Sequence, residues 1–437
     1  MALPAKFERE RLLDEIKGNL RPDGSLDEKA QDIMHIIQDQ LDRQQPAATC
    51  VLGGSVAKQT YLKDNHDIDF FARFPASVPA GLLSELLEEA LSEVVKQYHT
   101  KLHRLHGSRD YFQFTVDDIT IEVIPVIEIA TAYDAQNVTD VSPLHVSWVA
   151  KHTAGDDYLC DEIRLAKQFC KAAGIYGAES YISGFSGHVL DILVIHYGSF
   201  LKLVSAAAAE WKDRAILDPE HHLKDPLQEL NDAKVISPLV LVDPVDKNRN
   251  AAAALSKEVY DTFKTAAKTF LSTSNPERLR SFFEIKAVTR ESIQEELAHL
   301  NRTGKHVALL YTWQPLPGKK DIMGAKLLKA HTFLQRAFKE HDFSVVKQGW
   351  NFSFSYFLVK DEELPELKEL EGPPKQMKKA ADEFVNKHGE KAVSLKNERY
   401  VAQVKREFRD VTALAKALAI AGYIWEKVAD VKLEIIS

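Results

Sequence analysis

The first 45 residues carry two amphipathic helical patterns. Apolar side chains recur at helical spacing over residues 6–45, with an interruption near Pro22-Asp23-Gly24, and this pattern predicts two helices. The pattern then changes. The short apolar run Cys50-Val51-Leu52 ends at Gly53 and predicts a strand that leads into a tight turn and the start of a helix.

Strands then alternate with helices up to about residue 143. Residues 66–71 indicate a second strand and residues 79–100 an amphipathic helix. Residues 111–116 and 119–126 predict a hairpin that turns at Asp117-Asp118. Strands interleaved with helices over about 100 residues are typical of a compact α/β domain.

The remaining chain divides into a helical part and a mixed part. Helical periodicity dominates up to about residue 272 and includes residues 162–173 and 187–209. Beyond residue 276, strand patterns at 307–313 and 352–358 flank a predicted helix near 324–340, and a hinge at 369–374 precedes a charged tail that we expect to be helical. The expected domains are therefore 1–143, 144–275 and 276–437.

Composition and charge exclude several classes of protein. Hydrophobic residues make up 45% and charged residues 27% of 437 residues, as in ordinary globular proteins. The net charge of −8 excludes a generally basic, histone-like nucleic-acid binder but allows a local basic groove. The three cysteines, Cys50, Cys160 and Cys170, form no CxxC pair. The charged N-terminus and the lack of long apolar runs predict a cytoplasmic protein without a membrane partner.

Two features near the N-terminus carry chemistry. A Gly54-Ser55 turn that opens a helix presents backbone N–H groups and a hydroxyl, which suit phosphate. Asp67 and Asp69 lie two apart on a predicted strand, so both carboxylates project from one face. Such a pair repels strongly unless a cation binds between its members, and oxygen ligands suit Mg²⁺ that also holds substrate phosphates.

A third acid lies on a later strand. Glu122 is the one acid within the apolar run Ile119–Pro125, where an unpaired buried carboxylate would be costly. Taken singly, the Gly-Ser turn and the Asp-x-Asp pair are more often a plain turn and a solvated strand edge. Together with Glu122 they predict a two-metal site.

This combination resembles the nucleotidyltransferase superfamily related to DNA polymerase β. The resemblance implies an α/β plus α fold, with a polymerase-β-like nucleotidyltransferase palm, a helical central domain, and an α+β C-terminal body and tail. The rest of the chain is similar to the archaeal-type (class I) CCA-adding tRNA nucleotidyltransferases. The matching segments are Ser142–His145, Arg164–Phe169, Gly174–Glu179, Gly184–Gly187, Asp191–Val194, Tyr197–Phe200 and Val242–Asn250.

The resemblance implies roles for residues that would otherwise pass as ordinary surface positions. Lys167 and Tyr176, with Ser55 and Lys58, are expected to hold the triphosphate, and Arg249 with His145 is expected to contact the base or ribose. The further residue His152 is expected to be structural or solvated. Three departures from the family pattern stand out, namely Lys58 for Arg, Glu122 for Asp and Ser142 for Thr.

The function implied is template-independent addition of C, C and A to the 3′ end of tRNA from CTP and ATP, with two Mg²⁺ ions and release of pyrophosphate. The tRNA acceptor arm would be the partner. Two alternatives stay open, namely a poly(A)- or uridylyl-adding polymerase acting on other RNA and a catalytically inactive RNA-binding scaffold. A homodimer is one option for the oligomeric state.

The tail adds a basic segment. Residues 375–416 hold 11 Lys or Arg against 6 Asp or Glu, a local charge of +5, with Phe384, Tyr400 and Phe408 interleaved. Basic helices with aromatic residues suit an RNA backbone, although a charged stretch is more often a solvated helix face. We expect Lys405, Arg406 and Arg409 to contact RNA.

Overall fold

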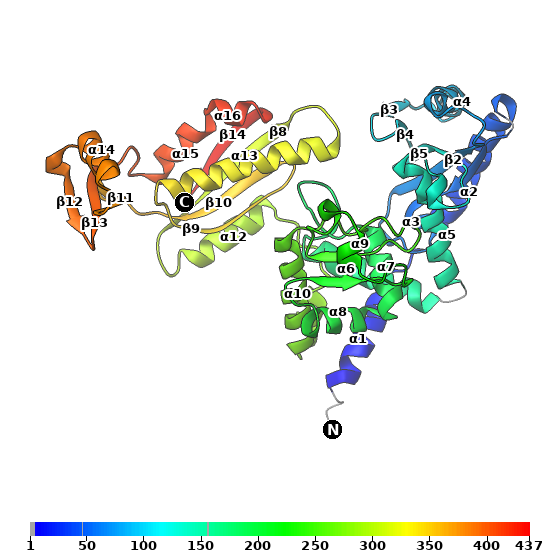
Figure 1. The fold of residues 1–437 in the computed structure, drawn as a ribbon, viewed down its shortest axis with the longest axis horizontal. Helices are drawn as coiled ribbons and strands as arrows, with labels where there is room; N and C mark the ends of the chain where they lie inside the picture. The colour runs from blue at the N-terminus through cyan, green and yellow to red at the C-terminus, as the bar shows by residue number, and fades with distance from the viewer. Residues whose placement is uncertain (1–4, 46, 155–156) are drawn as a thin grey trace. The chain divides into compact units, whose positions relative to one another are not determined.

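The computed structural model describes residues 5–45, 47–154 and 157–437. The chain forms two compact units, one up to Lys286 and one from Ala287 to Ser437. The mixture of helices and sheets agrees with the expected α/β plus α fold class (Figure 1). The finer division into domains 1–143, 144–275 and 276–437 stays a prediction.

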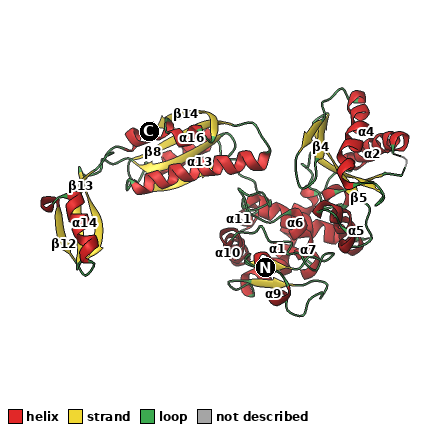
Figure 2. Ribbon diagram, turned by 45° about the horizontal axis from the view of Figure 1, so that its top comes forward, coloured by secondary structure: helices red, strands yellow, loops and turns green. Residues whose placement is uncertain are grey.

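A five-stranded sheet forms the first part of unit one. Its strand order is β1-β2-β5-β4-β3, in which β2 and β5 run parallel and the other pairs run antiparallel. Two amphipathic helices, α2 (Ser25–Gln44) and α4 (Leu83–Gln97), share one core with apolar side chains of this sheet (Figure 2). The strands are β1 Thr49–Leu52, β2 Asp67–Phe74, β3 His103–Leu105, β4 Tyr111–Val116 and β5 Ile119–Ile127.

The second part of unit one is a helical core built around aromatic side chains. Phe169, Phe200, Phe270 and Phe283 lie with their ring centroids 5.3–5.9 Å apart. Five of these six contacts are edge-to-face and one is tilted, and such contacts stabilise a helical core beyond the burial of apolar area. The helices are α1 Ala5–Leu20, α5 Ser142–Thr153, α6 Asp157–Ala172, α7 Gly187–Tyr197, α8 Phe200–Ala209, α9 Pro226–Glu229, α10 Lys257–Ser272 and α11 Pro276–Ser281, with the short parallel strands β6 Ala215–Leu217 and β7 Leu239–Leu241.

The helical span expected over residues 187–209 consists of two helices, not one. Gly198 has a left-handed φ of 78°, and the Ser199 hydroxyl accepts a hydrogen bond from the Lys202 backbone N–H, so one helix ends and another begins there. The two helices, α7 and α8, meet at a bend of 91°. No single helix in the described residues is long and apolar enough to cross a membrane. Among those residues, only α7 and α8 taken together have the length and apolar composition of a membrane span, and they are bent.

Unit two contains a four-stranded antiparallel sheet in the order β14-β8-β10-β9. Helices α13 and α15 pack with one set of strand residues, including Leu309 and Phe357, whereas α12 packs with the alternate residues Leu310 and Leu358 (Figure 1). The sheet is therefore covered on both faces. Its elements are α12 Arg290–Leu300, β8 His306–Pro315, α13 Lys320–Glu340, β9 Val345–Trp350, β10 Phe354–Lys360, α15 Val411–Ala419, α16 Gly422–Trp425 and β14 Val428–Ile436.

The expected hinge is wrong, and the tail is only partly helical. Residues 367–374 form strand β11, which pairs with β13 in a small three-stranded sheet beside α14 (Figure 1). The basic segment therefore contains two strands besides its helices, because the alternating apolar side chains of Tyr400, Ala402 and Val404 favour an extended chain. The elements are β11 Leu367–Pro374, α14 Lys378–His388, β12 Val393–Lys396 and β13 Arg399–Lys405.

Candidate active site

The parallel pairing of β2 and β5 aligns the predicted acids. Asp69 lies opposite Glu122, and Asp67 lies opposite Thr120. Residues opposite each other in register project to the same face, and the alternate residues Ile68 and Phe70 are fully buried in the core. The carboxylates of Asp67, Asp69 and Glu122 thus belong to the face of the sheet that the core helices leave uncovered.

The glycine turn lies directly against Asp69. The backbone N–H of Gly53 donates a 2.7 Å hydrogen bond to the backbone oxygen of Asp69. Gly54 has a left-handed φ of 56°, and a Cβ at this position would lie 1.7 Å from Oδ2 of Asp69. Only glycine meets both demands, so the approach of the turn to the carboxylate explains Gly54. Ser55 follows in the short helix α3 (Gly54–Ala57).

Asp69 has a strongly perturbed pKa. Burial raises the pKa of Asp69, the charge of Asp67 raises it further, and Lys58 opposes both, with a result of about 6. A carboxyl group with this pKa gives up its proton readily when a divalent cation binds beside it. Perturbed carboxyl groups of this kind are common at functional sites.

The two predicted lysines meet on one buried acid. Lys58 Nζ lies 3.0 Å from Oδ2 of Asp191, and Lys167 Nζ lies 3.0 Å from Oδ1. Lys167 also donates to Thr60 Oγ1 at 2.8 Å. Burial alone would raise the pKa of Asp191, but the two ammonium groups outweigh it and lower the pKa to about 2. Burial lowers the pKa of Lys167.

Tyr176 belongs to the same group of side chains. A Cβ at Gly187 would lie 2.9 Å from the Tyr176 hydroxyl and 3.8 Å from Lys167 Nζ, so both side chains approach the start of helix α7. Burial raises the pKa of the Tyr176 phenol, so the hydroxyl stays protonated and able to donate. The structure thus brings Lys58, Lys167 and Tyr176 together around Asp191.

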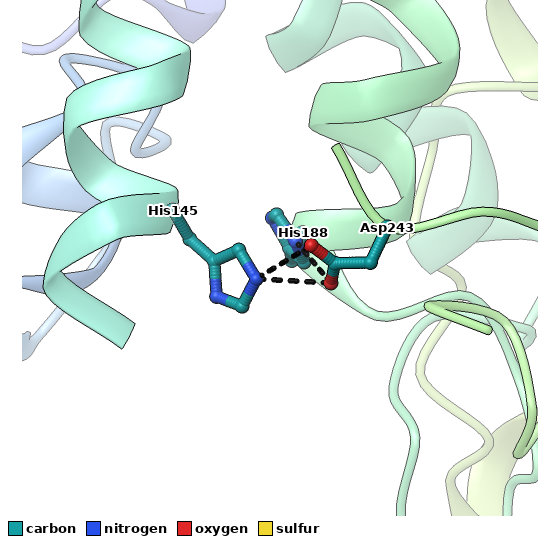
Figure 3. Close-up of side chains that lie close together, drawn as sticks. All are labelled: His145, His188 and Asp243. Atoms are coloured by element: carbon teal, nitrogen blue, oxygen red, sulfur yellow. Dashed lines mark hydrogen bonds and ion pairs between the residues drawn. The ribbon is translucent and has the colours of Figure 1, made fainter. Parts of the chain in front are cut away.

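A second cluster joins His145 to Arg249 through Asp243. His145 Nε2 lies 2.9 Å from Oδ2 of Asp243, and Arg249 Nη1 lies 3.3 Å from the same oxygen. His188 points at this carboxylate from helix α7, with Nε2 3.6 Å from Oδ2 (Figure 3). Among the described residues, this is the one set of three metal-type side chains whose ligand atoms all lie within 4.8 Å of one another.

The three basic residues predicted to contact RNA lie in unit two, and each is paired with an acid. Lys405 lies 3.2 Å from Glu366, Arg406 lies 2.6 Å from Asp342, and Arg409 lies 2.8 Å from Glu363. The Arg406 side chain is only 12% exposed, whereas that of Lys405 is 75% exposed. Local neutralisation therefore reduces the basic character that the sequence suggested.

Sequence reasoning gave no role to Asp191, His188 or Asp243. Asp191 had a signal, because it is the one acid in the apolar helix Gly187–Tyr197. Asp243 lay within a noted segment, and His188 had no signal of its own. The side chain of His152 lies 2.8 Å from the Trp148 carbonyl through Nδ1 and 3.7 Å from Glu220, in keeping with a structural role.

Three family models match successive parts of the chain. They are the nucleotidyltransferase domain over residues 34–126, the second domain of tRNA nucleotidyltransferase over residues 161–283, and the C-terminal domain of the CCA-adding enzyme over residues 302–424. The three models follow one another in the order in which the sequence suggested a palm, a central domain and a body.

Individual relatives give the same result over most of the chain. The CCA-adding enzyme of Nanoarchaeum equitans (strain Kin4-M) is 31% identical over 83% of this chain and 85% of its own length. The CCA-adding enzyme of Methanocaldococcus jannaschii is 28% identical over 93% of this chain and 90% of its own length. The Cid1 poly(U) polymerase structure has a TM-score of 0.52 at 14% identity over 64% of this chain and 99% of its own, which establishes a shared fold.

Proposed function

The chain belongs to the archaeal-type family of CCA-adding enzymes and is a tRNA nucleotidyltransferase. We propose that it adds C, C and A to the 3′ end of tRNA, with CTP and ATP as the nucleotide substrates. The observation that carries the proposal is the alignment of Asp67, Asp69 and Glu122 on one sheet face beside the Gly54 turn.

The acids fit two Mg²⁺ ions. The donors are hard carboxylate oxygens, and burial together with the charge of Asp67 raises the pKa of Asp69, which a bound cation would lower again. Asp67 and Asp69 would hold both ions, and Glu122 would hold one. When bound, the ions make the primer 3′-hydroxyl easier to deprotonate and neutralise charge on the departing pyrophosphate.

The residues around Asp191 would hold the triphosphate. Lys58 and Lys167 carry two positive charges against the single charge of Asp191, so the buried group retains a net positive charge. That charge attracts the nucleotide phosphates, and the Tyr176 hydroxyl and Ser55 supply further hydrogen bonds. Asp191 would keep both ammonium groups in place before the nucleotide arrives.

Arg249 and His145 would contact the base or ribose. The Arg249 side chain is 37% exposed, so its guanidinium can reach a ligand while Asp243 limits its freedom. His145 is buried, and burial lowers its pKa, so it would act as a neutral hydrogen-bonding group.

The acceptor arm of tRNA would contact Lys405, Arg406 and Arg409 in unit two. Each must exchange a carboxylate partner for a phosphate, so their contribution to binding would be modest and sensitive to salt. The domain division 1–143, 144–275 and 276–437, a cytoplasmic location and a homodimer belong to the same proposal.

One experiment separates this function from its alternatives. We expect tRNA that lacks its 3′ CCA, incubated with Mg²⁺ and each labelled nucleotide, to gain C, C and then A and no more. Asp67→Ala is the matched inactive control. Long homopolymer tails on other RNA would favour a poly(A)- or uridylyl-adding enzyme, and RNA binding without addition would favour a scaffold.

A further inference from the structure

The cluster formed by His145, His188 and Asp243 lies outside the acid site of the sheet. The three residues come from helix α5, helix α7 and the loop after β7, and their side chains point at one another (Figure 3). The Asp243 side chain is fully buried, and those of His145 and His188 are 8% and 16% exposed. The two imidazole centroids are 4.1 Å apart, with their planes tilted by 46°.

His188 is the least satisfied member of the cluster. Both of its ring nitrogens are buried, and neither makes a hydrogen bond within the described part of the chain. Its Nε2 lies 3.6 Å from Asp243 Oδ2, too far for a hydrogen bond. A buried polar nitrogen without a partner costs free energy, so a ligand that bonds to it would be favoured.

The three side chains also have the protonation states that a metal ligand needs. Burial lowers the pKa of both histidines, that of His188 to about 4, so each imidazole is neutral at pH 7. Burial alone would raise the pKa of Asp243, but its contacts with His145 and His188 outweigh burial and lower the pKa. A neutral His145 donates its Nε2 proton to Asp243, so metal binding through Nε2 moves that proton to Nδ1 without a net loss of protons.

We propose that His145, His188 and Asp243 form a binding site for a transition-metal ion of the zinc type. Zn–N and Zn–O bonds of about 2.0–2.1 Å place tetrahedral ligands about 3.3 Å apart. His145 Nε2 lies 2.9 Å from Asp243 Oδ2, slightly less than that value, and His188 Nε2 lies 3.6 Å from the same oxygen, slightly more. Small side-chain shifts would therefore complete three of four positions, leaving one for water or a ligand.

The donor set distinguishes this site from the acids of the sheet. Imidazole nitrogen suits zinc and cobalt, whereas the all-carboxylate set of Asp67, Asp69 and Glu122 suits Mg²⁺. The proposal concerns a different ion from that at the sheet acids. It shares His145 and Arg249 with the nucleotide contact proposed above, so the titration is carried out without nucleotide, and its outcome does not depend on CTP and ATP being the substrates.

Arg249 competes for the same carboxylate. Its Nη1 atom lies 3.3 Å from Asp243 Oδ2 and 3.5 Å from His145 Nε2, so the guanidinium supplies the positive charge that a metal ion would supply. Metal binding therefore requires the partly exposed Arg249 side chain to turn away. This competition predicts that removing the guanidinium strengthens metal binding.

Titration of the full chain with Co²⁺ alone tests the site. The visible absorption of nitrogen-bound Co²⁺ should saturate at one equivalent and should be displaced by Zn²⁺. His188→Phe keeps a ring of similar shape and should weaken Co²⁺ binding at least about tenfold, since even lost outer-shell partners cost 10–100-fold. Arg249→Gln should strengthen binding several-fold, because it removes the competing cation.

Matched controls separate this site from other metal ligands. His152→Gln changes a histidine outside the cluster, and Asp67→Asn changes the acid site; neither should alter the Co²⁺ signal. Thermal melts establish that each variant is folded, and Asp243→Asn replaces His188→Phe if the latter fails to fold. No saturable signal in the unsubstituted chain, or equal affinity in it and in a folded cluster variant, would overturn the proposal, whatever the outcome of the tRNA assay.

Discussion

Asp69→Asn should stabilise the protein at neutral pH while removing its activity. The folded chain holds the Asp69 proton more tightly than the unfolded chain does, because the pKa is about 6 rather than the ordinary 3.8. The unfolded state therefore loses this proton first as pH rises. Ionisation of Asp69 lowers the free energy of unfolding between about pH 4 and pH 6, and the cost is complete above that range.

The size of the effect follows from the shift. About two pKa units correspond to about 3 kcal/mol, and this is an upper limit because Asp69 is partly exposed to solvent. For a unit of this size, 3 kcal/mol raises the melting temperature by about 6 °C at most. Asparagine cannot ionise, so the variant should gain this increment at pH 7 and almost none at pH 4.

Melting curves in a chelator at pH 4 and pH 7 measure this difference directly. The exposed Asp64→Asn change serves as control, and it should shift neither curve. Addition of Mg²⁺ should raise the melting temperature of the unsubstituted chain more than that of Asp69→Asn. Nucleotide addition should fall by about 10³-fold, since a metal-binding carboxylate is lost. The quantity that decides is the gain in melting temperature of Asp69→Asn over the unsubstituted chain. If this gain is no larger at pH 7 than at pH 4, the electrostatic argument is refuted.

Three further predictions concern the turn, the third acid and the basic segment. Gly54→Ala should lower addition by at least about tenfold, seen in single-turnover rates, because its Cβ would displace the Asp69 carboxylate. Glu122→Gln should keep nucleotide binding within a few-fold but slow addition about 10²-fold, with Glu122→Asp milder; a lower melting temperature with full activity would instead indicate a structural ion pair. Replacing Lys405, Arg406 and Arg409 together should flatten the salt dependence of tRNA binding by up to about three phosphates; an unchanged slope would exclude this surface.

Local patterns in the sequence were sufficient for most elements of the fold. The two opening helices, the hairpin and the strands of residues 49–52 and 67–74 all follow from apolar periodicity, because each pattern buries one face. The break within residues 187–209 and the strands of the tail were not predicted. A single Gly198, and the alternation of Tyr400, Ala402 and Val404, decided the backbone there against the surrounding composition.

The sequence by itself determined which acids share a face, since strand alternation places Asp67 and Asp69 together whatever the rest of the chain does. Tertiary structure alone decided the buried partners. Lys58 meets Asp191 across 133 residues, and His145 meets Asp243 across 98. No local period encodes such contacts, because they form only when separately folded helices pack and must satisfy the charges they bury. Packing also pairs Lys405, Arg406 and Arg409 with acids, although the sequence showed only a basic stretch there.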